Sequence, residues 1–211
     1  MKRFIRDHVR YIDEIQCAAA RVVAGVRAHA RNRDPSNNPN GIFDSFHIRR
    51  GDFQFKDTRI SAEQILENSK DELTPKSTIF VATDERKKDF FKPLRQDYDL
   101  LFLDDFKEEL KGVNTNYYGM IDQLVASRGN VFFGCFHSTF TGYINRIRGY
   151  HSVKDEAPGY EKGVLPTTYY YSNLDKKFIM QKYSPLKGAF FNRENPISWR
   201  DLNKGIGMLN S

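Results

Sequence analysis

The sequence predicts an α/β fold in which helices flank a parallel β-sheet. One observation is that short, almost entirely apolar runs, such as residues 78–83, suit strands that are covered on both faces. A second is that these runs alternate with amphipathic helical patterns between about residues 10 and 148. A third is that 211 residues, including 17 Phe and 11 Tyr, are enough for one domain with a sizeable core.

The first predicted elements are a helix and a strand separated by a loop. Residues 10–31 carry apolar residues at three- and four-residue steps, which predicts a helix. Its inward positions are expected to be Ile12, Ile15, Ala19, Val22, Val23 and Val26. Residues 32–41 are rich in Asn, Pro and Gly and predict a loop, and residues 43–48 predict the first core strand. Ser61 to Gln64 form a capping box that opens a short helix.

Three further strand–helix pairs complete the predicted domain. The strands are expected at residues 78–83, 100–103 and 131–135, and the helices at residues 85–95, 117–128 and 139–148. Because strand and helix alternate, we expect all four strands to be parallel. Beyond about Tyr150 the pattern ends, and residues 151–211 are expected to wrap the domain as loops and short helices.

The overall charge of +6 favours anionic partners. Basic and acidic residues are interleaved, however, and most aromatic residues fall at predicted core positions, which argues against a nucleic-acid-binding surface. Cys17 and Cys135 lie in apolar contexts and are expected to be two buried thiols. The chain contains neither an apolar run of the roughly 20 residues that span a bilayer nor the apolar stretch of a signal peptide.

Polar sequences follow three of the predicted strands, where open parallel sheets bind their ligands. The first is His-Ile-Arg-Arg-Gly-Asp-Phe at residues 47–53. Arg49 and Arg50 suit a pyrophosphate clamp, because a guanidinium forms bidentate hydrogen bonds to phosphate oxygens. Gly51 would allow the backbone to approach a ligand closely. An Arg–Asp ion pair on a surface loop would account for the same spacing.

The other two strand ends offer one carboxylate and two hydroxyls. Asp84 is placed to accept hydrogen bonds from a base or ribose, or to cap the helix that follows it. Ser138 and Thr139 lie at the entrance to a predicted helix. The free N–H groups and the dipole of that helix would make an anion site, although the two residues would serve equally as an N-cap.

Together these motifs resemble those of the GDP-fucose protein O-fucosyltransferase family. Residues 47–53 resemble its first signature and residues 79–85 its second, and the stretch from Asp122 to Phe140, followed by Arg146, resembles its third. The resemblance covers about residues 10–148. It implies a Rossmann-like donor-binding domain, similar to the C-terminal domain of a two-domain GT-B glycosyltransferase.

The resemblance also implies a reaction: inverting, metal-independent transfer of fucose from GDP-fucose to a Ser or Thr hydroxyl of a protein. Arg49 would be the catalytic residue that binds the β-phosphate and stabilises the leaving GDP. The implied substrate-binding residues are His47, Arg50, Gly51, Asp52, Phe53, Asp84, Ser138, Thr139 and Phe140. No cofactor or metal is expected, and the acidic pairs Asp97/Asp99 and Asp104/Asp105 are interpreted as solvated or helix-capping.

For the domain organisation, we expect residues 1–211 to form a single GDP-sugar-binding domain without the N-terminal acceptor domain of the complete enzymes. The resemblance implies the lumen of the secretory pathway, although no targeting segment is recognised in the chain. Two alternatives remain: a catalytically silent GDP-sugar-binding module, which would act through a partner, and a nucleic-acid-binding domain.

Overall fold

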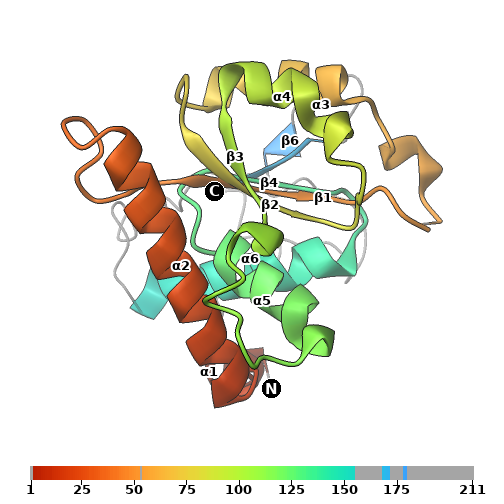
Figure 1. Ribbon diagram of the computed structural model, residues 1–211. Coiled ribbons are helices and arrows are strands. Elements are labelled where there is room, and N and C mark those ends of the chain that lie inside the picture. The colour runs from red at the N-terminus through yellow and green to blue at the C-terminus, as the bar shows by residue number, and fades with distance from the viewer. Residues whose placement is uncertain (1, 53, 155–167, 172–177, 180–211) are drawn as a thin grey trace.

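The computed structural model describes residues 2–52, 54–154, 168–171 and 178–179. The predicted site residue Phe53 and most of residues 151–211 therefore lie outside the described residues. Within them, six strands form one sheet in the order β3-β2-β1-β4-β5-β6 (Figure 1). The strands are β1 (Asp44–Ile48), β2 (Thr78–Thr83), β3 (Asp99–Leu101), β4 (Phe132–Gly134), β5 (Thr168–Tyr170) and β6 (Phe178–Ile179).

The strands β1 to β5 are parallel, and β6 alone pairs antiparallel with its neighbour. The predicted parallel arrangement of the first four strands is therefore confirmed. The central strand β1 pairs with β2 from Asp44 to Ile48 and with β4 at Ser45 and Phe46. All of its side chains are buried, including the polar Asp44, Ser45 and His47, so the strand is covered on both faces.

Helices cover both faces of the sheet (Figure 1). One face packs against α2 (Asp13–Arg33), α5 (Tyr118–Ala126) and α6 (Thr139–Lys154), and the other against α3 (Ala62–Ser69) and α4 (Lys92–Asp97). A short α1 (Lys2–His8) precedes them, and 3₁₀ turns occur at Lys56–Thr58, Lys70–Glu72, Lys88–Phe91, Leu103–Asp105 and Thr115–Tyr117. Successive residues of β4 serve opposite layers: Phe132 belongs to the first core and Phe133 to the second. The α/β Rossmann-like fold is thus confirmed.

Helix starts differ from the prediction in two places. Ile12, expected to face inward, is 55% exposed, because it is the extended residue before α2 and not part of the helix. The helix predicted at residues 85–95 is a 3₁₀ turn followed by α4, whose first turn contains Pro93. Proline has no N–H to donate and is therefore favoured at a helix start, so the α-helix begins there. The Ser61 cap is confirmed, since its side chain accepts from the N–H of Gln64.

The C-terminal segment is also different from the prediction. Of residues 151–211, expected as loops and short helices, Thr168–Tyr170 form β5 and extend the parallel sheet. Tyrosine and threonine favour strands, and the run is too short to show a periodic pattern in the sequence. The expectation of two buried thiols is half right: Cys135 is buried, whereas Cys17 is exposed.

Candidate functional site

A cleft of 540 Å³ opens at the carboxyl ends of β1, β2 and β4. It is lined by His47, Arg49, Gln54, Phe55, Thr83, Asp84, Gly119, Asp122, His137, Ser138, Thr139 and Phe140. The lining thus includes predicted site residues from all three strand ends. Arg50, Gly51 and Asp52 are not among the lining residues, although they belong to the same loop. This arrangement follows from the parallel sheet, which brings the loops after its strands to one edge.

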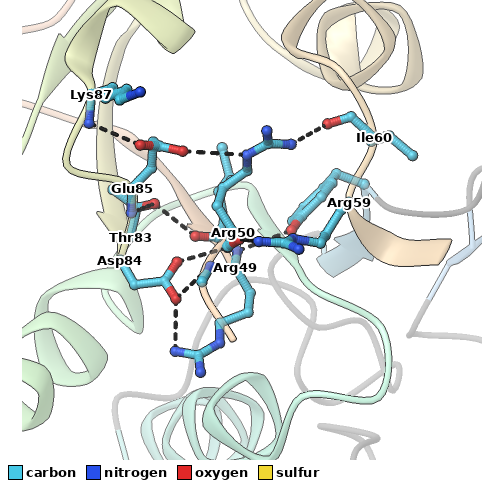
Figure 2. A network of polar contacts seen from close by, with 11 residues as sticks. Arg49, Arg50, Arg59, Ile60, Thr83, Asp84, Glu85 and Lys87 are labelled. Carbon is cyan, nitrogen blue, oxygen red and sulfur yellow. Dashed lines mark hydrogen bonds and ion pairs between the residues drawn. The ribbon is translucent and has the colours of Figure 1, made fainter. Parts of the chain in front are cut away.

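The carboxylate of Asp84 organises the loop after β1 (Figure 2). Its Oδ1 accepts from the N–H of Arg50 at 2.7 Å, and its Oδ2 accepts from the N–H of Gly51 at 2.9 Å. Oδ2 also lies 2.8 Å from Nη1 of Arg49 in an ion pair. Asp84 therefore joins the end of β2 to the loop after β1, and its oxygens are engaged within the protein.

Gly51 is required by this contact. A Cβ at residue 51 would lie 2.4 Å from Oδ2 of Asp84, closer than atoms pack in proteins. Any side chain would thus push the loop away from the carboxylate that anchors it. The glycine serves the fold of the loop and does not itself face the cleft.

Arg49 and Arg50 point in opposite directions (Figure 2). Arg49 lines the cleft, and its Nη2 donates to the carbonyl of Asp52 at 2.8 Å. An ion pair of Arg49 was one interpretation of this sequence, and the structure shows one with Asp84 rather than with the carboxylate of Asp52. The Arg49 side chain stays 36% exposed, so it is accessible from the cleft.

Arg50, by contrast, contacts residues outside the cleft and holds the loop in place. Its Nη1 donates to the carbonyl of Ile60 at 2.8 Å, and its Nε lies 3.5 Å from a carboxylate oxygen of Glu85. The guanidinium also stacks over the ring of Phe90, 4.0 Å from the centroid. The side chain of Arg59 donates to the carbonyl of Arg50. The structure therefore gives Arg50 a supporting place outside the cleft.

The N-terminus of α6 forms the opposite wall. Ser138 is buried, Thr139 is the first residue of the helix, and both line the cleft, so the helix end whose first N–H groups lack intrahelical partners borders it. His137, just before them, adopts a left-handed backbone with φ of 63° and stacks on Phe55 at 4.3 Å. A non-glycine residue in this conformation is uncommon and recurs at functional sites. No sequence signal identified His137 or Phe55.

His47 is held at the back of the cleft. Its Nδ1 lies 2.7 Å from Oγ1 of Thr141, which also accepts from the N–H of Cys135 at 3.0 Å. The imidazole stacks on Phe140, with ring centroids 4.4 Å apart. Burial lowers the pKa of His47 to about 3, so the ring is neutral at physiological pH. Because Nδ1 is engaged with Thr141, the other nitrogen of the neutral ring can offer either an N–H or a lone pair, but no charge.

Asp122 is a lining residue to which the sequence reasoning gave no role. It projects from α5, and among the described residues its buried Oδ1 has no hydrogen-bond partner. Desolvation raises the pKa of Asp122 well above its usual range, and the nearby Asp104 adds to this effect. In the sequence, Asp122 begins the stretch that resembles the third signature of the family, but no function was assigned to it.

The acidic residues considered for metal binding have other partners. Asp105 accepts from the N–H of Phe102 and caps a 3₁₀ turn, as expected. Asp99 is neither solvated nor a cap: it accepts from Thr78 and pairs with His29 at 2.8 Å. In the part of the chain that the structure describes, no three His, Cys, Asp or Glu side chains are grouped as a metal site would require.

Comparison with protein families identifies the family of this chain. The family model described as GDP-fucose protein O-fucosyltransferase matches residues 1–151, more than half of the chain. No match was found among curated proteins. The matched residues include every described lining residue of the cleft, whereas β5 and β6 lie beyond the match.

Proposed function

The chain belongs to the GDP-fucose protein O-fucosyltransferase family, and on this premise we propose that the cleft binds the GDP part of GDP-fucose. The observation that carries the proposal is the convergence of Arg49 and the N-terminus of α6 on one cleft. A guanidinium fork and a helix N-terminus are two well-suited partners for phosphate oxygens, and here they face the same volume.

The diphosphate would lie between these two groups. A guanidinium carries five N–H donors, so Arg49 can donate to phosphate while Asp84 holds it in place. The hydroxyls of Ser138 and Thr139 and the first N–H groups of α6 would bind from the other side. The backbone N–H groups of Arg50 and Gly51 already donate to Asp84, so they take no part.

The base would be recognised by Asp122. Guanine presents two adjacent donors, N1–H and the N2 amino group, and a carboxylate can accept both. Asp122, whose buried Oδ1 has no partner among the described residues, lines the cleft together with Phe140 and Gly119, where a planar base has an aromatic neighbour. Uracil has no such pair of donors. The proposal therefore predicts a preference for GDP over UDP, and it moves base recognition from Asp84 to Asp122.

We extend the proposal to the reaction itself. The acceptor oxygen would bond to the anomeric carbon as the bond to the β-phosphate breaks, and the acceptor proton would leave to a base. Negative charge then grows on the diphosphate, where Arg49 and α6 stabilise it without a metal. Removing one such preorganised donor typically costs about 100- to 1,000-fold in rate. A Ser or Thr of a secretory-pathway protein would be the acceptor.

Calorimetric titration tests the proposal directly. The chain would be titrated with GDP, UDP, GDP-fucose and GDP-mannose, each with and without EDTA. We expect GDP and GDP-fucose to bind, UDP to bind at least about 10-fold more weakly, and EDTA to have no effect. Absence of GDP binding would refute the donor site. Binding without transfer, even to a supplied acceptor protein, would instead favour a silent GDP-sugar-binding module.

None of the helices that the structure describes combines the length and apolar composition needed to cross a bilayer.

A further inference from the structure

Tyr171 lies directly after β5, beyond the residues that match the family. It is 1% exposed, and its own backbone is fixed on two sides. Its N–H donates to the carbonyl of Gly134 at 3.1 Å, and its carbonyl accepts from Nδ2 of Asn68 at 2.7 Å. The backbone of Tyr171 is therefore held by β4 on one side and by α3 on the other.

The phenol of Tyr171 reaches the first residue of the cleft loop. Its oxygen accepts from the N–H of Arg49 at 3.1 Å. This hydrogen bond takes the place of a backbone hydrogen bond between β1 and β4. The N–H of Ser45 donates to Val131 on the β4 side of β1, and alternate residues of a strand direct their N–H groups to the same side.

The N–H of Arg49 thus also points toward β4, but β4 ends at Gly134 and the chain turns into α6. Without another acceptor, this N–H would be unsatisfied in a partly buried position, which is unfavourable. The Tyr171 phenol supplies that acceptor. Three successive N–H groups, those of Arg49, Arg50 and Gly51, then donate to side-chain oxygens of Tyr171 and Asp84.

We infer that Tyr171 is a positioning residue for Arg49, so that a residue outside the family match completes the donor site. The inference rests on the proposed function, because it assumes that Arg49 binds the diphosphate. Tyr171 holds the Arg49 backbone from the β5 side, while Asp84 holds its guanidinium from the β2 side. A side chain fixed at both ends loses little conformational entropy when it binds phosphate.

The test compares two tyrosines of the same segment. Tyr171→Phe keeps the buried ring and removes only the phenol oxygen, which accepts from Arg49 and is also hydrogen-bonded to the side chain of Cys135. Its matched control is Tyr169→Phe, because Tyr169 is also buried, at 5% exposed, but donates to Glu72 at 2.6 Å, away from the loop. We expect Tyr171→Phe to weaken GDP binding about 3- to 10-fold and to leave guanosine binding unchanged. Tyr169→Phe should lower the melting temperature without changing GDP affinity.

A double-mutant cycle separates positioning from a general loss of structure. In the Arg49→Ala background, Tyr171→Phe should cause no further loss of GDP affinity, because the side chain to be positioned is gone. Equal losses in both backgrounds, or unchanged GDP affinity in Tyr171→Phe, would overturn the inference and leave the proposed function intact. If the unmodified chain binds no GDP, the proposed function and this inference fall together.

Discussion

Replacing Arg49 by alanine is the sharpest test of the site. The change removes the ion pair with Asp84 and the hydrogen bond to the carbonyl of Asp52. Asp84 keeps its two backbone donors, so the loop retains its main anchor. The ion-pair partners are 36% and 27% exposed, and pairs screened to this degree contribute at most about 1 kcal/mol to the free energy of unfolding.

The expected effect on binding is larger than the effect on stability. A hydrogen bond to a charged group contributes about 1.5–3 kcal/mol, so GDP affinity should fall about 10- to 150-fold. The carboxylate of Asp84, left without its cation, would also repel the diphosphate. The melting temperature should fall by at most about 2–4 °C, because a loss of 1 kcal/mol shifts the melting temperature of a domain of this size by that amount.

Calorimetry with GDP and guanosine and a thermal melt of the same sample measure both quantities. Guanosine affinity should be unchanged, since only the phosphate contact is lost. Arg49→Lys should recover part of the GDP affinity, because a point charge cannot reproduce the planar fork. Arg86→Ala, which removes an exposed arginine near the same sheet edge, controls for net charge. Unchanged GDP affinity in Arg49→Ala would refute the assignment of Arg49 to the diphosphate.

Three further predictions concern buried ionisable groups. Asp122→Asn should weaken GDP binding about 10- to 150-fold and yet raise the free energy of unfolding at pH 7. The pKa of Asp122 is raised in the folded protein, so ionisation of this residue destabilises the native protein as pH rises above about 4. The gain in the free energy of unfolding of Asp122→Asn, measured in denaturant melts, should therefore vanish near pH 4. A variant less stable than the native protein at pH 7 would contradict this. The folded pKa of His47 is lowered, so stability should be lost as pH falls from about 6.5 toward 3, by up to about 1.4 kcal/mol per pH unit. His47→Gln should lack this slope, and parallel pH profiles of the two proteins would count against a neutral His47. Arg148→Met should lower the free energy of unfolding by roughly 3 kcal/mol or more, because the guanidinium of Arg148 donates to the carbonyls of Ser127, Gly129 and Asn130. A change below about 1 kcal/mol in urea melts would show that water can replace the guanidinium as the donor to these carbonyls.

Local pattern was enough to predict the core of the fold and the edge of the sheet that carries the site. The largely apolar run at β2 is buried on both faces almost to its end, and such a strand leaves a strong signal in sequence. Parallel pairing then places the residues after them together, which is why Arg49, Asp84 and Ser138 line one cleft.

Side-chain directions could not be predicted in the same way. Arg49 and Arg50 are identical in type and adjacent in sequence, yet one lines the cleft and the other stacks on Phe90. That difference depends on Glu85 and the carbonyl of Ile60, which reach Arg50 only after the sheet and α3 have packed. Asp84 likewise has sequence signals for a cap or a nucleoside contact, whereas its partners are amides of a different loop.

The strand β5 has a consequence for where this protein can be divided. A fragment ending at residue 151, where the family match ends, would leave β4 at the edge of the sheet. Phe132 and Phe133 are fully buried on opposite faces, so that edge would be flat, apolar and ready to pair with another copy. The fragment would also lose Thr168, to which Arg148 donates. We therefore expect this fragment to aggregate when expressed. The residues that match the family model end before the last parallel strand of the sheet, so the match does not mark the end of the folded unit.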